Sequence, residues 1–263
     1  MLQSMNPHPR DVNISFEEIG HVYTILGKKD HTSVTTWIKQ FFGKFNADAI
    51  INRMMNSPKW PESKYYGKTK EEIKEEWKQS GDLAAKLGTD MHQMFEDYYN
   101  GLPVQTGSLE YGYFEKFVAD HTHLKPYRSE WTVYDEDLKI SGSIDMTFLN
   151  EDGTISIYDW KRCKSIEKTT SFRQFAKPPI QHIPDTNFWH YTLQLNAYKM
   201  ILERKYGFVV KDMFLICIHP DLDTTYQKHE VAPMDMDPLI KYCLLYTSPS
   251  PRDRTRSRMP SSA

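Results

Sequence analysis

The sequence predicts an α/β (α+β) fold in which a central mixed β-sheet is flanked by helices. Three observations indicate this class. The first half of the chain carries apolar residues at helical spacing, whereas residues 128–162 change to the alternation of β-strands. Residues 187–207 return to helical spacing. A continuous apolar run at 211–220 then predicts a buried strand, so helices and strands share one core.

The composition fits a folded protein with a substantial core. Of the 263 residues, 39% are hydrophobic and 26% are charged, and the formal net charge is −2. Such a charge gives no global attraction to nucleic acid, so any such binding must use a local basic surface. Few cysteines, and no signal peptide or apolar run long enough to cross a membrane, predict a soluble intracellular protein without a membrane partner.

The last residues read as something other than natural protein. CLLYTSPSPRD and SRMPSSA, within residues 243–263, are what a common transposase-type sequencing adapter encodes when it is translated. We therefore expect residues 243–263 to be a disordered translation artefact. The natural sequence is expected to stop near Tyr242, before the protein's own C-terminus. A disordered Ser/Pro/Arg tail would have a similar composition. Residues 1–242 are expected to form a single domain.

Local signals place the first elements in order. Residues 1–12 read as a loose polar tail, and residues 14–29 as two short strands around a turn. Ser33 can cap a helix that ends near Gly43. A second helix is expected over residues 47–55.

The clearest helix signal begins at Thr69, which forms a capping box with Glu72. Helical spacing continues to about residue 101, but Gly81 and Gly88 leave open whether this is one helix or two. A further helix is expected over residues 109–120. The later elements are three strands in meander order within 128–162, a long loop over 163–185, a helix over 187–207, and the strand at 211–220 with a partner within 224–233.

Charged residues interrupt two of the predicted strands. Asp145 and Asp159 stand in apolar surroundings, and Lys161 follows the second acid after one residue. If residues 151–153 form a three-residue loop, with Gly153 in its left-handed position, Asp145 lies opposite Asp159. The two carboxylates and Lys161 then share one face, with opposed Cβ atoms about 4.5 to 5.5 Å apart.

A two-residue loop of Asp152 and Gly153 is the alternative register, and it would send the two carboxylates to opposite faces. In the first register the acids repel each other unless a cation lies between them. Hard oxygen ligands suit Mg²⁺ or Mn²⁺, and Lys161 could then orient or deprotonate water or hold a phosphate. Alone, the spacing is equally typical of a solvated edge hairpin with a salt bridge.

Three other features are weak individually. His92 and Glu96 lie one helical turn apart, as do Gln194 and Tyr198. Surface or core helices without any site would carry the same pairs. The loop after Lys161 is basic, and aromatic residues are interleaved with the charges, which is typical both of a strand-binding loop and of a solvated loop beside core aromatics. Its basic residues are Arg162, Lys164, Lys168, Arg173 and Lys177.

In chain order these features read G-T-x-x-H-x-x-x-E, G-x-I-D, D-W-K and Q-x-x-x-Y. This order resembles the PD-(D/E)XK nucleases of the RecB type, which include mitochondrial genome maintenance exonucleases and nucleases of phages and large DNA viruses. The resemblance covers about residues 85–205, and it implies a restriction-endonuclease-like core.

The resemblance also implies roles for individual residues. Asp145, Asp159 and Lys161 would be catalytic, and Mg²⁺ or Mn²⁺ would be bound by His92, Asp145, Asp159 and the backbone carbonyl of Trp160. The substrate would be contacted by Gln194, Tyr198, Arg162, Lys164 and Arg173, with Glu96 and Glu130 as possible accessory residues. The iron–sulfur cluster of several relatives needs four cysteines, so it is not expected here.

The expected function is therefore a metal-dependent deoxyribonuclease, in particular an exonuclease acting on single-stranded DNA or DNA ends in replication, recombination or repair. Two alternatives remain open. One is a catalytically silent DNA-binding module of the same fold, and the other is an RNA-directed nuclease.

Overall fold

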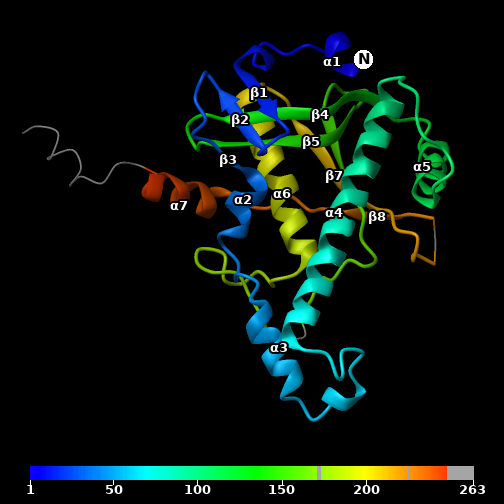
Figure 1. Ribbon diagram of the computed structural model, residues 1–263. Coiled ribbons are helices and arrows are strands. Elements are labelled where there is room, and N and C mark those ends of the chain that lie inside the picture. Colours follow the sequence, from blue (N-terminus) through cyan, green and yellow to red (C-terminus); the bar gives the residue numbers. More distant parts are fainter. Residues whose placement is uncertain (171–172, 224, 248–263) are drawn as a thin grey trace, which may run out of the picture.

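A computed structural model describes residues 1–170, 173–223 and 225–247 (Figure 1). It confirms a mixed α+β architecture with a central mixed sheet flanked by helices. Among the described helices, none combines the length and hydropathy of a membrane-spanning segment. The helices are α1 (Leu2–Met5), α2 (Val34–Lys39), α3 (Ala47–Met55), α4 (Lys70–Tyr99), α5 (Leu109–Asp120), α6 (Asn187–Ile201) and α7 (Asp237–Thr247).

Within the described residues, the central sheet has six strands. β5 is antiparallel to β4 along one edge and to β6 along the other, and the two-residue β3 runs parallel to the start of β5. β6 and β7 are parallel, and β8 is antiparallel to β7. A separate hairpin, β1–β2, precedes the sheet. The strands are β1 (Ile14–Glu17), β2 (Val22–Ile25), β3 (Thr32–Ser33), β4 (Lys125–Asp135), β5 (Ile140–Leu149), β6 (Ile155–Lys161), β7 (Val210–Cys217) and β8 (Gln227–Glu230).

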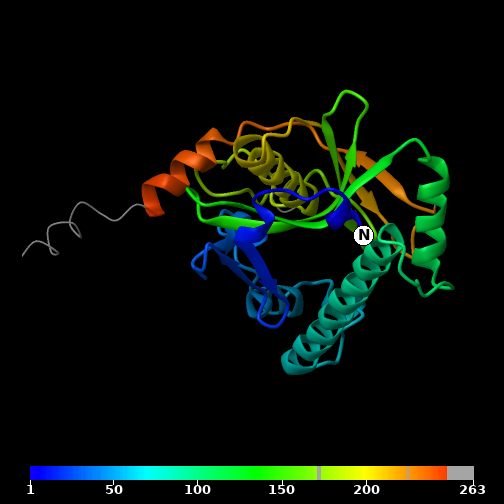
Figure 2. The same ribbon diagram turned by 90° about the horizontal axis from the view of Figure 1, so that it is seen from above.

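Helices cover both faces of this sheet. α6 lies on one side and α4 on the other (Figure 2). On β6 the alternation of side chains divides the core accordingly: Ile155 and Ile157 pack in the cluster that contains α6, whereas Tyr158 and Trp160 pack with aromatic residues of α4 and α5. The strand is therefore buried on both faces along almost its whole length.

The register of the β5–β6 hairpin is the one that the three-residue loop predicts. Met146 pairs with Tyr158 and Leu149 pairs with Ile155. The Asn150 amide donates to the Thr154 carbonyl at 2.9 Å, and Gly153 has a φ of 80°. Glycine adopts this left-handed conformation without the strain that a Cβ would cause.

The N-terminal segment differs from the expected loose tail. Leu2 is buried, and its amide donates to the Asn100 side chain at the end of α4. Asp11 accepts hydrogen bonds from Arg128 and Trp131 of β4. The prediction was wrong because tertiary ion pairs, rather than local apolar periodicity, fix this segment.

α4 is a single helix of 30 residues, and the predicted capping box between Thr69 and Glu72 is present. Its lower half projects with α3 from the body of the molecule (Figure 1). α3 and α5 have the predicted bounds. α2 ends at Lys39, four residues before the expected Gly43, and the chain continues in tight turns that bury both Phe41 and Phe42.

The C-terminal helix extends beyond the expected boundary. α7 continues through Thr247, so residues 243–247 are helical rather than disordered. Cys243 is buried, and its thiol bonds to the Leu138 carbonyl. A helix that is already formed can extend into any sequence without glycine or proline, which accounts for the difference. The rest of the expected artefact, residues 248–263, lies outside the described part.

Candidate active site

The two acids of the hairpin lie where the strand pairing of β5 and β6 stops. The last paired residues at this end are Met146 and Tyr158. Asp145 and Asp159 are their immediate neighbours on the two strands, just beyond the pairing. From there the Trp160 amide donates to Asp145 Oδ2 at 2.8 Å, so a side chain takes the place of a strand carbonyl. Both acids are buried, with Asp159 only 1% exposed.

The alternation of faces along β5 is interrupted in the same place. A Cβ on Gly142 would point into the Tyr198 ring of α6, whereas Met146 packs with the aromatic residues of α4 and α5. Residues four apart in a regular strand share a face, so the strand changes orientation between these two positions. Asp145 lies in this interval, which turns its carboxylate toward the seam between β5 and β6.

α4 brings a histidine to this seam. His92 Nε2 donates to the Trp160 carbonyl at 2.9 Å, and His92 Nδ1 lies 3.6 Å from Asp145 Oδ2 and 3.6 Å from Glu130 Oε1. One ligand atom from each of His92, Glu130 and Asp145 lies within 4.8 Å of the other two. Three of the residues singled out in the sequence therefore lie together, and the Trp160 carbonyl adjoins them through His92, although Glu130 was expected only as an accessory.

The second acid is held by the lysine. Lys161 Nζ lies 2.7 Å from Asp159 Oδ2. Oδ1 of Asp159 has no hydrogen-bond partner among the described residues. Asp159 and Lys161 therefore form a buried ion pair beside the cluster of His92, Glu130 and Asp145 rather than within it.

Burial and mutual charge shift the pKa of four side chains in this site, those of Asp145, Asp159, Lys161 and His92. Burial raises the pKa of both Asp145 and Asp159, against the opposing effect of His92 and Lys161. Burial alone would lower the pKa of Lys161, but the carboxylates of Asp159 and Asp145 outweigh it and raise the pKa. Burial would also lower the pKa of His92, but the carboxylates of Asp145 and Glu130 outweigh it and raise the pKa to about 9.

Glu130 occupies a special backbone position in β4. Its φ is 40°, in the left-handed region that non-glycine residues rarely adopt. Its second carboxylate oxygen accepts a hydrogen bond from Ser143 of β5 at 2.8 Å. Backbone strain of this kind is typical of functional positions, and here it aims the carboxylate at His92.

An open cleft leads to this cluster. It has a volume of about 680 Å³ and lies between α4, the β1–β2 hairpin and the strands β4 and β5. His92, Glu96 and Glu130 line it. Burial raises the pKa of Glu96, and the nearby Glu130 charge adds to this effect. The predicted accessory acid Glu96 thus lies at the cleft but outside the group of His92, Glu130 and Asp145.

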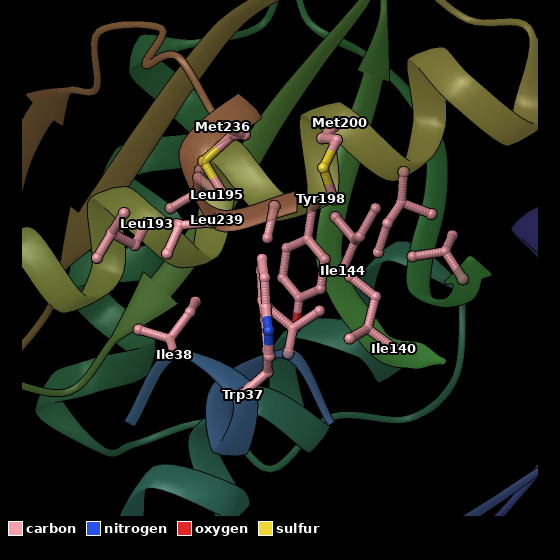
Figure 3. Close-up of a cluster of buried hydrophobic side chains, with 14 of the residues drawn as sticks. Trp37, Ile38, Ile140, Ile144, Leu193, Leu195, Tyr198, Met200, Met236 and Leu239 are labelled. Atoms are coloured by element: carbon pink, nitrogen blue, oxygen red, sulfur yellow. The ribbon is translucent and has the colours of Figure 1, made fainter. Parts of the chain in front are cut away.

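The predicted pair on α6 is buried against the sheet. Tyr198 lies among Ile140, Ile144 and Met200 (Figure 3), and its hydroxyl accepts a hydrogen bond from Gln194 Nε2 at 3.4 Å. Burial raises the pKa of Tyr198 well above its usual value, and the charges of Asp145 and Asp159 contribute. The pair therefore lies near both acids, but Tyr198 is only 3% exposed.

Of the predicted basic contacts, two are already paired. Arg162 forms an ion pair with Glu110 of α5 at 2.9 Å, and its side chain is 13% exposed. Lys164 is paired with Asp221, but its side chain is 68% exposed, so the pair is weak and easily exchanged. Arg173 is exposed on the loop between β6 and α6. Lys164 and Arg173 are thus more accessible to a ligand than Arg162.

Sequence reasoning missed one residue of the site. The Lys161 ammonium lies 5.0 Å from the centroid of the Tyr191 ring, within the range of a cation–π interaction. Tyr191 precedes Gln194 and Tyr198 by three and seven positions, so helical spacing could have placed it on the same face of α6. The signal was hidden because Tyr191 belongs to a run of four consecutive aromatic or histidine residues.

Comparisons with known proteins add little to this description. No family model matches the chain, and no curated protein matches it. Among solved structures 20 chains match, and one of them is titled "Crystal structure of SSO0001". That protein is 18% identical over 55% of this chain, with a TM-score of 0.30, and the chain spans 60% of its length.

Proposed function

We propose that the chain is a Mg²⁺- or Mn²⁺-dependent deoxyribonuclease of the PD-(D/E)XK type that acts on single-stranded DNA or DNA ends. The observation that carries the proposal is the junction of β5, β6 and α4. There His92 lies against Asp145 where the paired positions of β5 and β6 end, and the Asp159–Lys161 ion pair lies beside them.

The donor atoms fit a hard divalent cation. Carboxylate oxygens and an imidazole nitrogen converge within 4.8 Å at His92, Glu130 and Asp145. Asp159 Oδ1 is buried and lacks a hydrogen-bond partner in the described chain, as an unused ligand atom would. His92, Asp145, Asp159 and the Trp160 carbonyl would hold the ion, with Glu130 as a further candidate. A bound ion would supply positive charge to the phosphodiester and favour ionisation of water.

Lys161 acts through the positive charge of its ammonium group rather than as a general base. Its raised pKa keeps the ammonium protonated at neutral pH. A protonated lysine in a buried site stabilises the negative charge that develops on a phosphate during cleavage. The Asp159 carboxylate and the Tyr191 ring hold the ammonium in position.

Residues at the rim bind and orient the strand. The exposed Lys164 and Arg173 can contact backbone phosphates, which supply most of the affinity for a nucleic acid strand. Gln194 and Tyr198 of α6 pack against the sheet beside the site, where Gln194 donates a hydrogen bond to the Tyr198 hydroxyl. A role of Arg162 in binding would require Glu110 to give up its ion pair.

The test is degradation of labelled single-stranded DNA, double-stranded DNA and RNA of one sequence, with and without Mg²⁺ or Mn²⁺. Asp159→Asn and Lys161→Met should each lower the rate at least about 100-fold. Glu151→Gln, in the exposed hairpin loop, and Lys125→Met, at the exposed start of β4, are the matched controls and should cut like wild type. A circular single strand should survive if free ends are required.

The outcomes separate the candidate functions. If wild type and both site variants bind DNA and are equally inert, the chain is a binding module. If all of them are equally active, a contaminating nuclease is cutting. Preferential degradation of the RNA strand would instead establish an RNA-directed enzyme.

A further inference from the structure

Two cysteines lie side by side at the ends of the parallel strands β6 and β7. Cys217 is the last residue of β7 and is the strand partner of Lys161, the last residue of β6. Cys163 follows Lys161 by two residues, and the Cys163 and Cys217 thiols lie near enough to shift each other's pKa. Cys217 is buried, whereas Cys163 is partly exposed.

The surroundings of these thiols favour reaction at the more accessible sulfur. The neighbouring Cys217 thiol lowers the pKa of Cys163, and the Lys161 ammonium lowers it further, although burial opposes both. The same pairing and burial raise the pKa of Cys217. A thiolate is the nucleophilic form of cysteine, and an accessible thiolate beside a second thiol is the usual arrangement of an oxidation sensor.

We propose that Cys163 is an oxidative modification site at which a peroxide is reduced, and that Cys217 resolves the product into a reversible disulfide. The chemistry of the pair stands on its own geometry. Its consequence for DNA cleavage rests on the proposed nuclease function.

The reaction balances with hydrogen peroxide as the oxidant. The Cys163 thiolate attacks one peroxide oxygen, the O–O bond breaks, and hydroxide leaves, so that Cys163 becomes a sulfenic acid. The Cys217 sulfur then attacks the Cys163 sulfur, an S–S bond forms, and water leaves with the thiol proton. Both sulfurs are oxidised by one electron each, and the peroxide is reduced by two.

The disulfide would act on the candidate active site through the backbone. A disulfide holds its two sulfurs about 2 Å apart, closer than two unbonded thiols can lie, so oxidation must draw the two strand ends together. The chain that must move begins directly after Lys161, whose ammonium pairs with Asp159. Because a misplacement of about 1 Å can lower a catalytic rate about 100-fold, we expect the oxidised protein to cut DNA at least about tenfold more slowly.

The experiment treats the full chain with hydrogen peroxide and measures the intact mass, the mapped disulfides and labelling by dimedone, which captures sulfenic acids. Wild type should lose two hydrogen atoms and yield a linked Cys163–Cys217 peptide that a thiol reductant separates. Cys217→Ser, and Cys217→Ala in case the first folds poorly, should stop at the sulfenic acid and be labelled at Cys163. Cys163→Ser should not react, and Cys243→Ser, the matched control, should react like wild type.

Activity is measured on the same samples before oxidation, after it and after reduction. Wild type and Cys243→Ser should slow and recover, whereas Cys163→Ser should not respond to peroxide. Failure to form the linked peptide while reduced protein cuts DNA would overturn the inference and leave the nuclease proposal intact. A linked peptide in a protein that never cuts DNA would support the thiol chemistry and contradict the nuclease.

Discussion

At the scale of single residues, Gly142 sets how closely α6 approaches β5. A Cβ at this position would lie 2.8 Å from Cε1 and 2.9 Å from the hydroxyl of Tyr198. Atoms do not approach so closely without displacement, so the absence of a side chain is what lets the tyrosine lie near the two acids.

Gly142→Ala is therefore expected to destabilise the protein by about 1 to 3 kcal/mol, because the Tyr198 ring must move within a packed core. The free energy of unfolding from urea denaturation measures this. Gly112→Ala in α5 is the control, since its Cβ would meet nothing within 4 Å, and it should be neutral or stabilising. Equal effects of the two substitutions would contradict the packing argument.

The sequence predicted some residues of the site and could not predict others. Asp145, Asp159 and Lys161 stood out because charged groups are unusual in apolar strands. His92 was singled out by the order of the motifs, since its spacing to Glu96 alone is common in helices. The part that Glu130 plays was not visible, because it depends on a left-handed backbone and on a neighbour across the sheet. Both depend on the tertiary structure and leave no local signal in the sequence.

At the scale of elements, α4 persists as one helix through two glycines. Gly81 has an ordinary helical backbone, and a Cβ there would meet nothing within 4 Å. Glycine in a helix loses more backbone entropy on folding than alanine does. The sequence predicted both ends of this helix, but its continuity depends on packing that no propensity records.

Gly81→Ala should stabilise the protein by about 0.5 to 1 kcal/mol for this reason. Gly107→Ala is the matched comparison, because it also has open space around it but has a φ of 109°. That substitution should destabilise, since an L-residue is strained there. Thermal denaturation of the two variants beside wild type measures this: the melting temperature should rise for Gly81→Ala and fall for Gly107→Ala.

At the scale of the whole molecule, the N-terminal segment ties α4 to β4. Asp11 accepts hydrogen bonds from Arg128 Nη1 at 2.8 Å, Trp131 Nε1 at 3.2 Å and the His8 amide at 3.0 Å. Burial opposes ionisation of Asp11, but these donors outweigh it and hold its pKa below the ordinary value of 3.8. This tie has no local signal in the sequence, because Arg128 and Trp131 lie 117 and 120 positions from Asp11.

Asp11→Asn should cost about 3 kcal/mol at neutral pH, because it leaves the buried Arg128 charge without its partner. A lowered pKa in the folded chain means that the stabilisation is complete above about pH 4 and is lost as the pH falls through the folded value. The difference between wild type and variant should therefore shrink on acidification. Urea denaturation of wild type and variant at several pH values tests this, and a difference that does not change with pH would contradict it.

The formal net charge of −2 makes a further whole-molecule prediction, which rests on the proposed function. Binding of a single strand must use a few local cations, so the affinity should fall only modestly with salt. Replacing Lys164 and Arg173 together by alanine should reduce the slope of log affinity against log salt by about 1.4, at about 0.7 per phosphate contact. Titrations with Ca²⁺ in place of Mg²⁺ measure it, and an unchanged slope would remove both residues from the binding surface.

The bond from the Trp160 amide to Asp145 has a consequence for hydrogen exchange. In the rest of the hairpin a slowly exchanging amide reports on strand pairing, whereas at Trp160 it reports on a side chain. Asp145→Ala should therefore make this one amide exchange much faster, while that of Tyr158 stays protected. The Trp160 amide is thus a probe of the candidate active site that can be read in the intact protein without a substrate.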